Sequence, residues 1–279
     1  MSNTFVNVYQ TSFDDMAKIA YEREGLKLPM TVRTKTGVVG KEHKFVFYGA
    51  PSAATTKSQY VSYADTGLGG TKAFKTATLV KNDWFDYVDK VDMASSSVDD
   101  VGYTATTAAV KIGQATDNRI TAALDAATTN TILSASSGLT KDKVLKGIEI
   151  LNAGNVPFAD RYCLVDAKQW TDLLKIEEFA SGDYVGGSTQ PLPWLTNANA
   201  RIWLGMTFIM FPGLPKLVND RSCLMYHRNA VGYAQALAMQ NEVAWVADRD
   251  SWIIKSTCYD GAVAIDPAGI VRILADESI

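Results

Sequence analysis

The chain has 279 residues, with 27 lysines and arginines against 30 aspartates and glutamates, so its formal net charge is -3. Hydrophobic residues make up 47% and charged residues 20%, a composition that excludes a disordered or fibrous chain. The sequence pI of about 5.5 argues against a protein that wraps nucleic acid with a basic surface, although a protein that merely encloses nucleic acid remains compatible with it.

Residues 1–35 predict an arm. Phe13, Ala17, Ile19 and Ala20 give one or two short amphipathic turns after Ser12, and Pro29 ends any helix there. The segment has too few apolar residues to build a core of its own. It also lacks the basic and apolar regions of a secretory signal, and no run in the chain approaches the roughly 18 apolar residues of a membrane helix. We therefore expect no membrane partner.

Residues 36–81 predict two strands joined by a long connection. Residues 44–48 and 76–80 are rich in β-forming side chains, and residues 49–75 between them are rich in Gly, Ser, Thr and Ala. A connection of this length is uncommon inside a compact domain and is usually functional. Because it has few large side chains to fold it back, we expect a two-stranded extension that projects from the domain.

The charge changes sign after this extension. Residues 33–81 contain eight basic and two acidic side chains, a net charge of +6, whereas residues 82–125 contain three and eight, a net charge of -5. Such blocks can steer one copy of a chain onto another, and the alternative is two separately solvated faces. On the first interpretation, the candidate contacts between subunits are Lys57, Tyr60, Tyr63, Lys72, Lys75, Asp83, Asp86 and Asp89.

The rest of the chain predicts a mixture of helices and strands. Apolar side chains recur at helical spacing over residues 98–129, a helix of about 45 Å at ~1.5 Å per residue, which would serve as a strut. A second helix is expected at residues 140–152, then a buried strand at 161–165 and a helix capped by Asp166. After a loop at residues 181–200, strands are expected at 202–211, 223–226, 243–246, 252–259, 262–265 and 269–274.

Catalytic and metal-binding patterns are missing from the sequence. It has no Gly-x-Ser-x-Gly, and its two histidines, His43 and His227, have no partner at metal-ligand spacing. Cys163, Cys223 and Cys258 lie in apolar runs without a Cys-x-x-Cys, so we expect buried thiols in a reducing compartment, with a catalytic or metal-binding thiol as the alternative. We expect no catalytic residue, no cofactor and no metal.

The order of these segments resembles the major capsid protein of tailed bacteriophages, which has the Hong Kong 97-type fold. The resemblance runs through TATLVKNDWFDYVDKVDMASSSVDD, KIGQATDNRITAALD, RYCLVDAKQWTDLL and RIWLGMTFIMFPGLP to the tail HRNAVGYA and SWIIKSTCYDGAVAIDPAGIVRILA. It covers nearly the whole chain and rests on the accumulation of segments, since no single motif is diagnostic.

The resemblance implies an α+β fold. It makes residues 1–35 the N-terminal arm, 36–81 the extended E-loop hairpin, 82–137 a P-domain with the long spine helix, 138–240 the A-domain, and 241–279 returning strands that complete the P- and A-domain sheets. Copies would form hexamers and pentamers of an icosahedral shell, assembled in the bacterial cytoplasm and located in the virion. The shell would enclose double-stranded DNA without sequence-specific binding, with portal and scaffolding proteins as partners and a decoration protein as an optional one.

Two departures and two alternatives accompany the resemblance. No helical scaffolding segment precedes the arm, so we expect a separate scaffolding protein or none. Some relatives are cross-linked by Lys–Asn bonds, but no motif identifies a partner for Lys57, Lys72 or Lys75, which favours solvated lysines. The first alternative is an encapsulin-like nanocompartment shell, and the second is a small cytosolic α/β enzyme.

Overall fold

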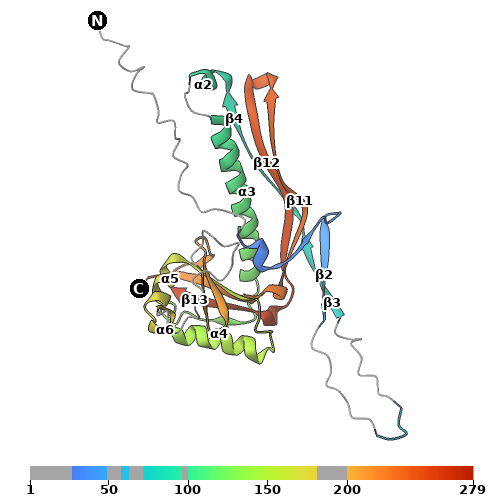
Figure 1. Ribbon diagram of the computed structural model, residues 1–279, viewed down its shortest axis with the longest axis vertical. Coiled ribbons are helices and arrows are strands. Elements are labelled where there is room, and N and C mark those ends of the chain that lie inside the picture. Colours follow the sequence, from blue (N-terminus) through green and yellow to red (C-terminus); the bar gives the residue numbers. More distant parts are fainter. Residues whose placement is uncertain (1–26, 49–57, 63–71, 96–99, 181–199, 279) are drawn as a thin grey trace.

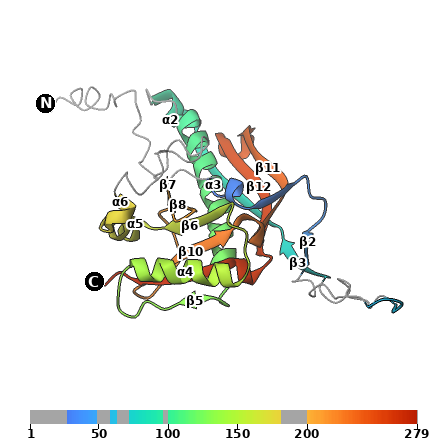
Figure 2. The ribbon, with the colours of Figure 1, turned by 60° about the horizontal axis from the view of Figure 1, so that its bottom comes forward.

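The fold has an upright part, a lower part and a side hairpin (Figure 1). The computed structural model describes residues 27–48, 58–62, 72–95, 100–180 and 200–278. In the upright part, the long helix α3 lies beside long strands. The lower part contains a second sheet covered by short helices, and the hairpin of β2 and β3 projects from the side, as the turned view in Figure 2 also shows.

The upright part is a sheet packed on α3 (Asp100–Asp125). Its strand order is β1-β11-β12-β4, with β1 at Arg33–Thr36, β11 at Val231–Val246, β12 at Ser251–Ala264 and β4 at Val80–Asp89. β1 runs parallel to β11, and the other neighbours are antiparallel. Alternate residues of β12 (Ile254, Ser256, Cys258 and Asp260) are buried on the side of α3, because successive side chains of a strand point to opposite faces. The short helix α2 (Lys90–Ser95) follows β4.

The lower sheet has the order β5-β13-β10-β6-β8-β7, with β9 paired to β10. Its strands are β5 (Thr131–Ile132), β6 (Arg161–Val165), β7 (Ala200–Trp203), β8 (Met206–Met210), β9 (Lys216–Leu217), β10 (Asp220–His227) and β13 (Ile270–Asp276). Both faces of its central strands are buried, which explains their continuous apolar runs.

Each face of the lower sheet has its own core. Tyr162 and Leu164 of β6 pack in one cluster with Leu28 and with Ile120 of α3. Cys163 and Val165 point the other way, into a cluster with side chains of the helices α4 (Lys141–Ala153), α5 (Ala167–Leu174) and α6 (Glu177–Ala180). The lower sheet is therefore held between these helices on one side and the C-terminal half of α3 on the other.

Several sequence predictions are confirmed. α3 lies within the predicted helix 98–129, and Ala108, Ile112, Ile120 and Leu124 of its periodic positions are buried. Thr140 caps α4, and the Asp166 carboxylate accepts a hydrogen bond from the N–H of Ala167 at the start of α5. All three cysteines are buried.

Two predictions about strands are wrong. Residues 202–211 form a hairpin of β7 and β8, because Leu204 and Gly205 turn the chain with φ angles of 51° and 73° while apolar side chains continue on both sides. The two strands expected at 252–259 and 262–265 are one strand, β12, which ends at Ala264, because the intervening Asp260 and Gly261 stay extended and buried against the rest of the fold.

Candidate assembly surfaces

The hairpin of β2 (Glu42–Tyr48) and β3 (Lys72–Thr78) has a buried root. Phe45, Ala77 and the adjoining Leu79 pack in one cluster with Ala234 and Ile265. The Phe45 ring lies 2.7 Å from where a Cβ of Gly232 would be, and the carbonyl oxygen of Thr78 lies closer still to the Cβ position of Gly261. Gly232 of β11 and Gly261 of β12 therefore let the root of the hairpin pack closely against the sheet of the upright part, called the upper sheet below.

The opposite side of the hairpin, the outer hairpin face, is apolar and basic. It consists of Lys44, Val46, Tyr48, Lys72 and Phe74, which are cross-strand neighbours or alternate along their strands. Tyr48 and Phe74 are 54% and 60% exposed. The Lys44 ammonium lies 5.1 Å from the centroid of the Phe74 ring, and the Lys72 ammonium 5.9 Å from that of Tyr48. This face thus presents aromatic surface and positive charge together.

The three candidate aspartates lie on β4 but do not form one patch. Asp83 and Asp89 occupy one face of the strand and Asp86 the other, as strand alternation requires. Asp83 already has partners in its own chain: Lys81 Nζ lies 2.7 Å from its carboxylate, and Thr257 Oγ1 donates to it at 2.6 Å. These two hydrogen bonds, that of Lys81 first, lower the pKa of Asp83. Asp86 is exposed, and Asp89 accepts from the N–H of Val91 at the start of α2.

The other candidates divide into exposed and undescribed residues. Lys72 and Lys75 are exposed on β3. Tyr60 is 96% exposed, with a φ of 67°, in the short described segment 58–62. Lys57 and Tyr63 lie outside the described residues, as do most of the predicted extension and the predicted turns of residues 12–20.

Charge counting alone missed a buried carboxylate between α3 and the upper sheet. Asp260 of β12 is fully buried and accepts hydrogen bonds from Thr116 Oγ1 at 2.7 Å and from the Tyr233 hydroxyl at 3.1 Å. It also forms an ion pair with Arg119, whose guanidinium donates to Asn82 Oδ1 at 2.8 Å. These contacts tie α3 to β4, β11 and β12.

A second buried carboxylate, Asp117, binds the backbone at residues 27 and 28. It accepts from the backbone N–H groups of Lys27 and Leu28, each at 3.1 Å. The sequence carries a signal for both sites: Asp117 and Arg119 lie within the apolar pattern of the helix, directly before Ile120. A charged residue on a buried stripe needs a partner.

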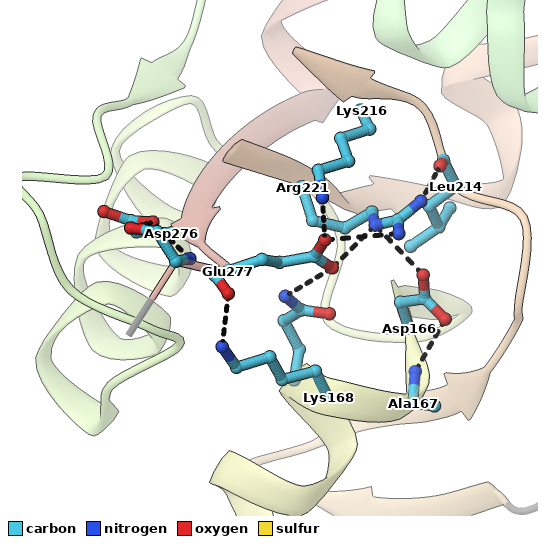
Figure 3. Close-up of polar contacts among 10 residues, drawn as sticks. Asp166, Ala167, Lys168, Leu214, Lys216, Arg221, Asp276 and Glu277 are labelled. Carbon is cyan, nitrogen blue, oxygen red and sulfur yellow. Dashed lines mark hydrogen bonds and ion pairs between the residues drawn. The ribbon is translucent and has the colours of Figure 1, made fainter. Parts of the chain in front are cut away.

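The C-terminal end closes on a third charged cluster (Figure 3). Glu277 accepts from Arg221 at 2.8 Å, pairs with Lys216 at 2.7 Å, and accepts from Gln169 at 3.4 Å. Its hydrogen bond with Arg221 is the largest cause that lowers the pKa of Glu277 to about 2. Arg221 also pairs with Asp166 at 3.0 Å and donates to the carbonyl of Leu214. The cluster joins β13, β10 and α5.

Neither a metal-binding cluster nor a membrane-spanning helix occurs in the described part of the chain. Among residues 27–48, 58–62, 72–95, 100–180 and 200–278, no group of three or more His, Cys, Asp or Glu side chains could hold a metal ion. Within the same residues, every helix is too short or too polar to span a bilayer.

Comparisons with known proteins agree with this architecture. The family model described as phage capsid protein matches residues 6–277. Among solved structures, the capsid of the cyanophage P-SCSP1u is similar with a TM-score of 0.66 and 14% identity, covering 95% of this chain and 93% of that one. The structure of Mycobacterium phage Che8 is similar with a TM-score of 0.67 and 18% identity, covering 94% of this chain and 95% of that one. The capsid of the cyanophage Pam1 is similar with a TM-score of 0.69 and 11% identity, covering 95% of each chain. No curated protein sequence matches. These likenesses confirm the Hong Kong 97-type fold.

Proposed function

Because this chain belongs to the phage capsid protein family, and is therefore a structural subunit of a virion shell, we propose that its copies meet through the outer hairpin face. In this proposal they form the hexamers and pentamers of an icosahedral shell around double-stranded DNA. Residues 1–35, 36–81, 82–137, 138–240 and 241–279 then serve as arm, E-loop extension, P-domain, A-domain and returning strands.

The observation that carries the proposal is the exposed apolar surface of the hairpin. Tyr48 and Phe74 remain more than half exposed although the root of the same hairpin is buried. Exposed aromatic side chains flanked by charge are typical of protein interfaces. The acidic end of β4 with α2 lies at the far end of the upright part, away from the hairpin (Figure 1). The basic hairpin of one copy therefore meets the acidic end of the next copy, a heterologous contact of the kind that closes into rings.

The charge balance supports the proposal that the shell encloses DNA without gripping it. With a net charge of -3 the chain has no overall attraction for phosphate, so the genome can be packaged and released. Portal and scaffolding proteins, and a decoration protein where one is used, complete the proposed partners. Shell assembly takes place in the host cytoplasm before the virion leaves the cell.

The test replaces the two aromatic side chains. We expect the double variant Tyr48→Ser, Phe74→Ser to give folded, soluble subunits and at least ten-fold fewer shells by negative-stain electron microscopy of cell extracts. The control variant Leu133→Ser, Leu174→Ser removes two exposed apolar side chains of the lower part and should leave the yield unchanged. Normal shells from the Tyr48, Phe74 variant would contradict the proposed contact.

A further inference from the structure

Residues 27 and 28 are fixed to α3 by a buried carboxylate. Each oxygen of Asp117 accepts one backbone N–H, Oδ2 from Lys27 and Oδ1 from Leu28, both at 3.1 Å. Asp117 has no exposed surface. In a buried site the geometry of such hydrogen bonds is maintained because water cannot replace them.

Two further contacts hold the same short segment. The Leu28 side chain is fully buried in the cluster that contains Ile120 and Leu124 of α3. Thr31 Oγ1 donates to the carbonyl of Leu28 at 2.7 Å, which leaves the Tyr226 hydroxyl, 2.6 Å away, to donate to Thr31. Residues 27–31 are therefore held at several points, and the direction of the chain at Lys27 is defined.

The same turn of α3 holds the root of the hairpin. Thr116 and Arg119, on either side of Asp117, bind Asp260 of β12. The residue after Asp260 is Gly261, on which Thr78 at the end of β3 rests. Arg119 also donates to the carbonyl of Val80, which begins β4 directly after the hairpin. Residues 116–119 thus hold the base of the N-terminal segment and the base of the hairpin.

Packing alone does not explain a carboxylate at position 117. A buried polar group is costly unless it is hydrogen-bonded, and an apolar side chain would fill the same space without that cost. The carboxylate fixes the direction of the backbone at Lys27 and Leu28, because it binds two consecutive N–H groups of this segment, which lies 89 residues away in sequence.

We propose that Asp117 is a positioning residue for shell assembly. It fixes the direction of the chain at Lys27, relative to the hairpin held by the same turn of α3. The inference rests on the proposed function, because it gives Asp117 a role only if these two extensions contact neighbouring copies.

The first experiment needs no assembly. All native thiols are buried, so nitroxide labels can be placed on Glu24→Cys and on Thr106→Cys, an exposed position roughly 17 Å along α3 from Asp117. The width of the distance distribution is measured by pulsed electron spin resonance on unassembled subunits. Asp117→Asn should at least double this width. Lys27→Pro, which removes one N–H donor without altering α3, should do the same. An unchanged width in both variants overturns the inference.

The second experiment measures shells recovered from expressing cells. Asp117→Asn should lower the yield at least ten-fold in the full chain and less than two-fold in a chain lacking residues 2–23. The control is Asp125→Asn, which removes a carboxylate of the same helix that pairs with Arg272 at 3.5 Å and contacts neither extension, and it should leave the yield unchanged. Equal losses in the full and shortened chains overturn the inference, because Asp117 would then act only on the fold.

The two experiments separate this inference from the proposed function. If removing residues 2–23 leaves the yield unchanged, the arm has no part in assembly and the proposed function fails for that segment, whatever the distances show. If removing them abolishes shells, the width of the distance distribution alone decides whether Asp117 sets the direction.

Discussion

Glu277 shows how a single side chain can close a fold. It lies near the end of the chain, and its carboxylate is 12% exposed between Lys216 and Arg221. Its backbone also takes part, since its N–H donates to the carbonyl of Asn219 and its carbonyl accepts from Lys168 at 2.6 Å. One residue thereby connects the β9–β10 turn, α5 and the end of β13.

The lowered pKa of Glu277 predicts a pH dependence of stability. Because the folded pKa of about 2 lies below the ordinary value of 4.5, the ionised group stabilises the fold above pH 4.5, and this contribution is lost as the pH falls toward 2. Glu277→Gln should therefore lower the free energy of unfolding by about 2 kcal/mol at pH 7. The difference from the unsubstituted chain should shrink between pH 4.5 and 2.

Urea unfolding of unassembled subunits at several pH values measures this difference. Glu149→Gln, which removes a carboxylate of α4 outside the cluster, is the control and should change little at any pH. A gap between Glu277→Gln and the unsubstituted chain that persists undiminished at pH 2 would show that charge is not the cause.

At the scale of elements, the packing of the β2–β3 hairpin against β12 depends on Gly261. A Cβ there would overlap the backbone carbonyl of Thr78, which cannot rotate away as a flexible side chain could. We expect Gly261→Ala to lower the free energy of unfolding by about 1–3 kcal/mol, because either β3 or β12 must shift. Urea unfolding again measures the effect, and shell yield should fall with it.

The control for Gly261→Ala is Gly154→Ala. Gly154 has a φ of -76°, and a Cβ there would lie at least 3.5 Å from its nearest neighbours, so the substitution should change stability by less than about 0.5 kcal/mol. If the two variants are equally stable, the hairpin does not rest on β12 as described.

Elements with a strong local pattern could be predicted from the sequence, and those set by distant contacts could not. The periodicity of α3 survives in the fold because Ile120 and Leu124 pack in the core, and the apolar run of β6 survives because both of its faces are buried. β11 extends over Val231–Val246, whereas the sequence indicates only its last four residues, because its alanines and glutamines gain strand structure from pairing with β12. Counting charges placed Asp83 among free acids, although Lys81 two residues earlier already binds it.

For the whole molecule, the family match decides between the interpretations left open by the sequence. A phage capsid protein model covers residues 6–277, which identifies a structural protein and excludes the small enzyme as a description of this chain. The basic hairpin and the acidic end of β4 with α2 lie far apart in the subunit (Figure 1).

Charge should govern the rate of assembly more than the stability of the shell. Exposed ion pairs contribute only ~0–1 kcal/mol each, and salt screens them over a Debye length of about 10 Å at 0.1 M. We expect Lys72→Glu, Lys75→Glu to slow assembly in low salt, measured by light scattering, and added Asp86→Lys, Asp89→Lys to restore part of the rate. High salt should slow the unsubstituted chain by the same screening.

The matched control reverses two lysines of the lower part. Lys146→Glu, Lys175→Glu changes the net charge by the same amount on exposed positions of α4 and of the turn after α5. It should leave the rate unchanged. Assembly of the Lys72, Lys75 variant at the unsubstituted rate in low salt would show that the basic hairpin is merely solvated.

The contact of the hairpin with Gly232 and Gly261 also depends on the order in which the ribosome makes the chain. The hairpin ends at Thr78, but Gly232 and Gly261, on which it rests, are synthesised more than 150 residues later. At ~5–20 residues per second, this interval lasts roughly 10 to 40 s. Strand β13 of the lower sheet, which pairs with β10, emerges later still. A nascent chain therefore cannot pack its hairpin against the sheet until Gly232 and Gly261 have been synthesised.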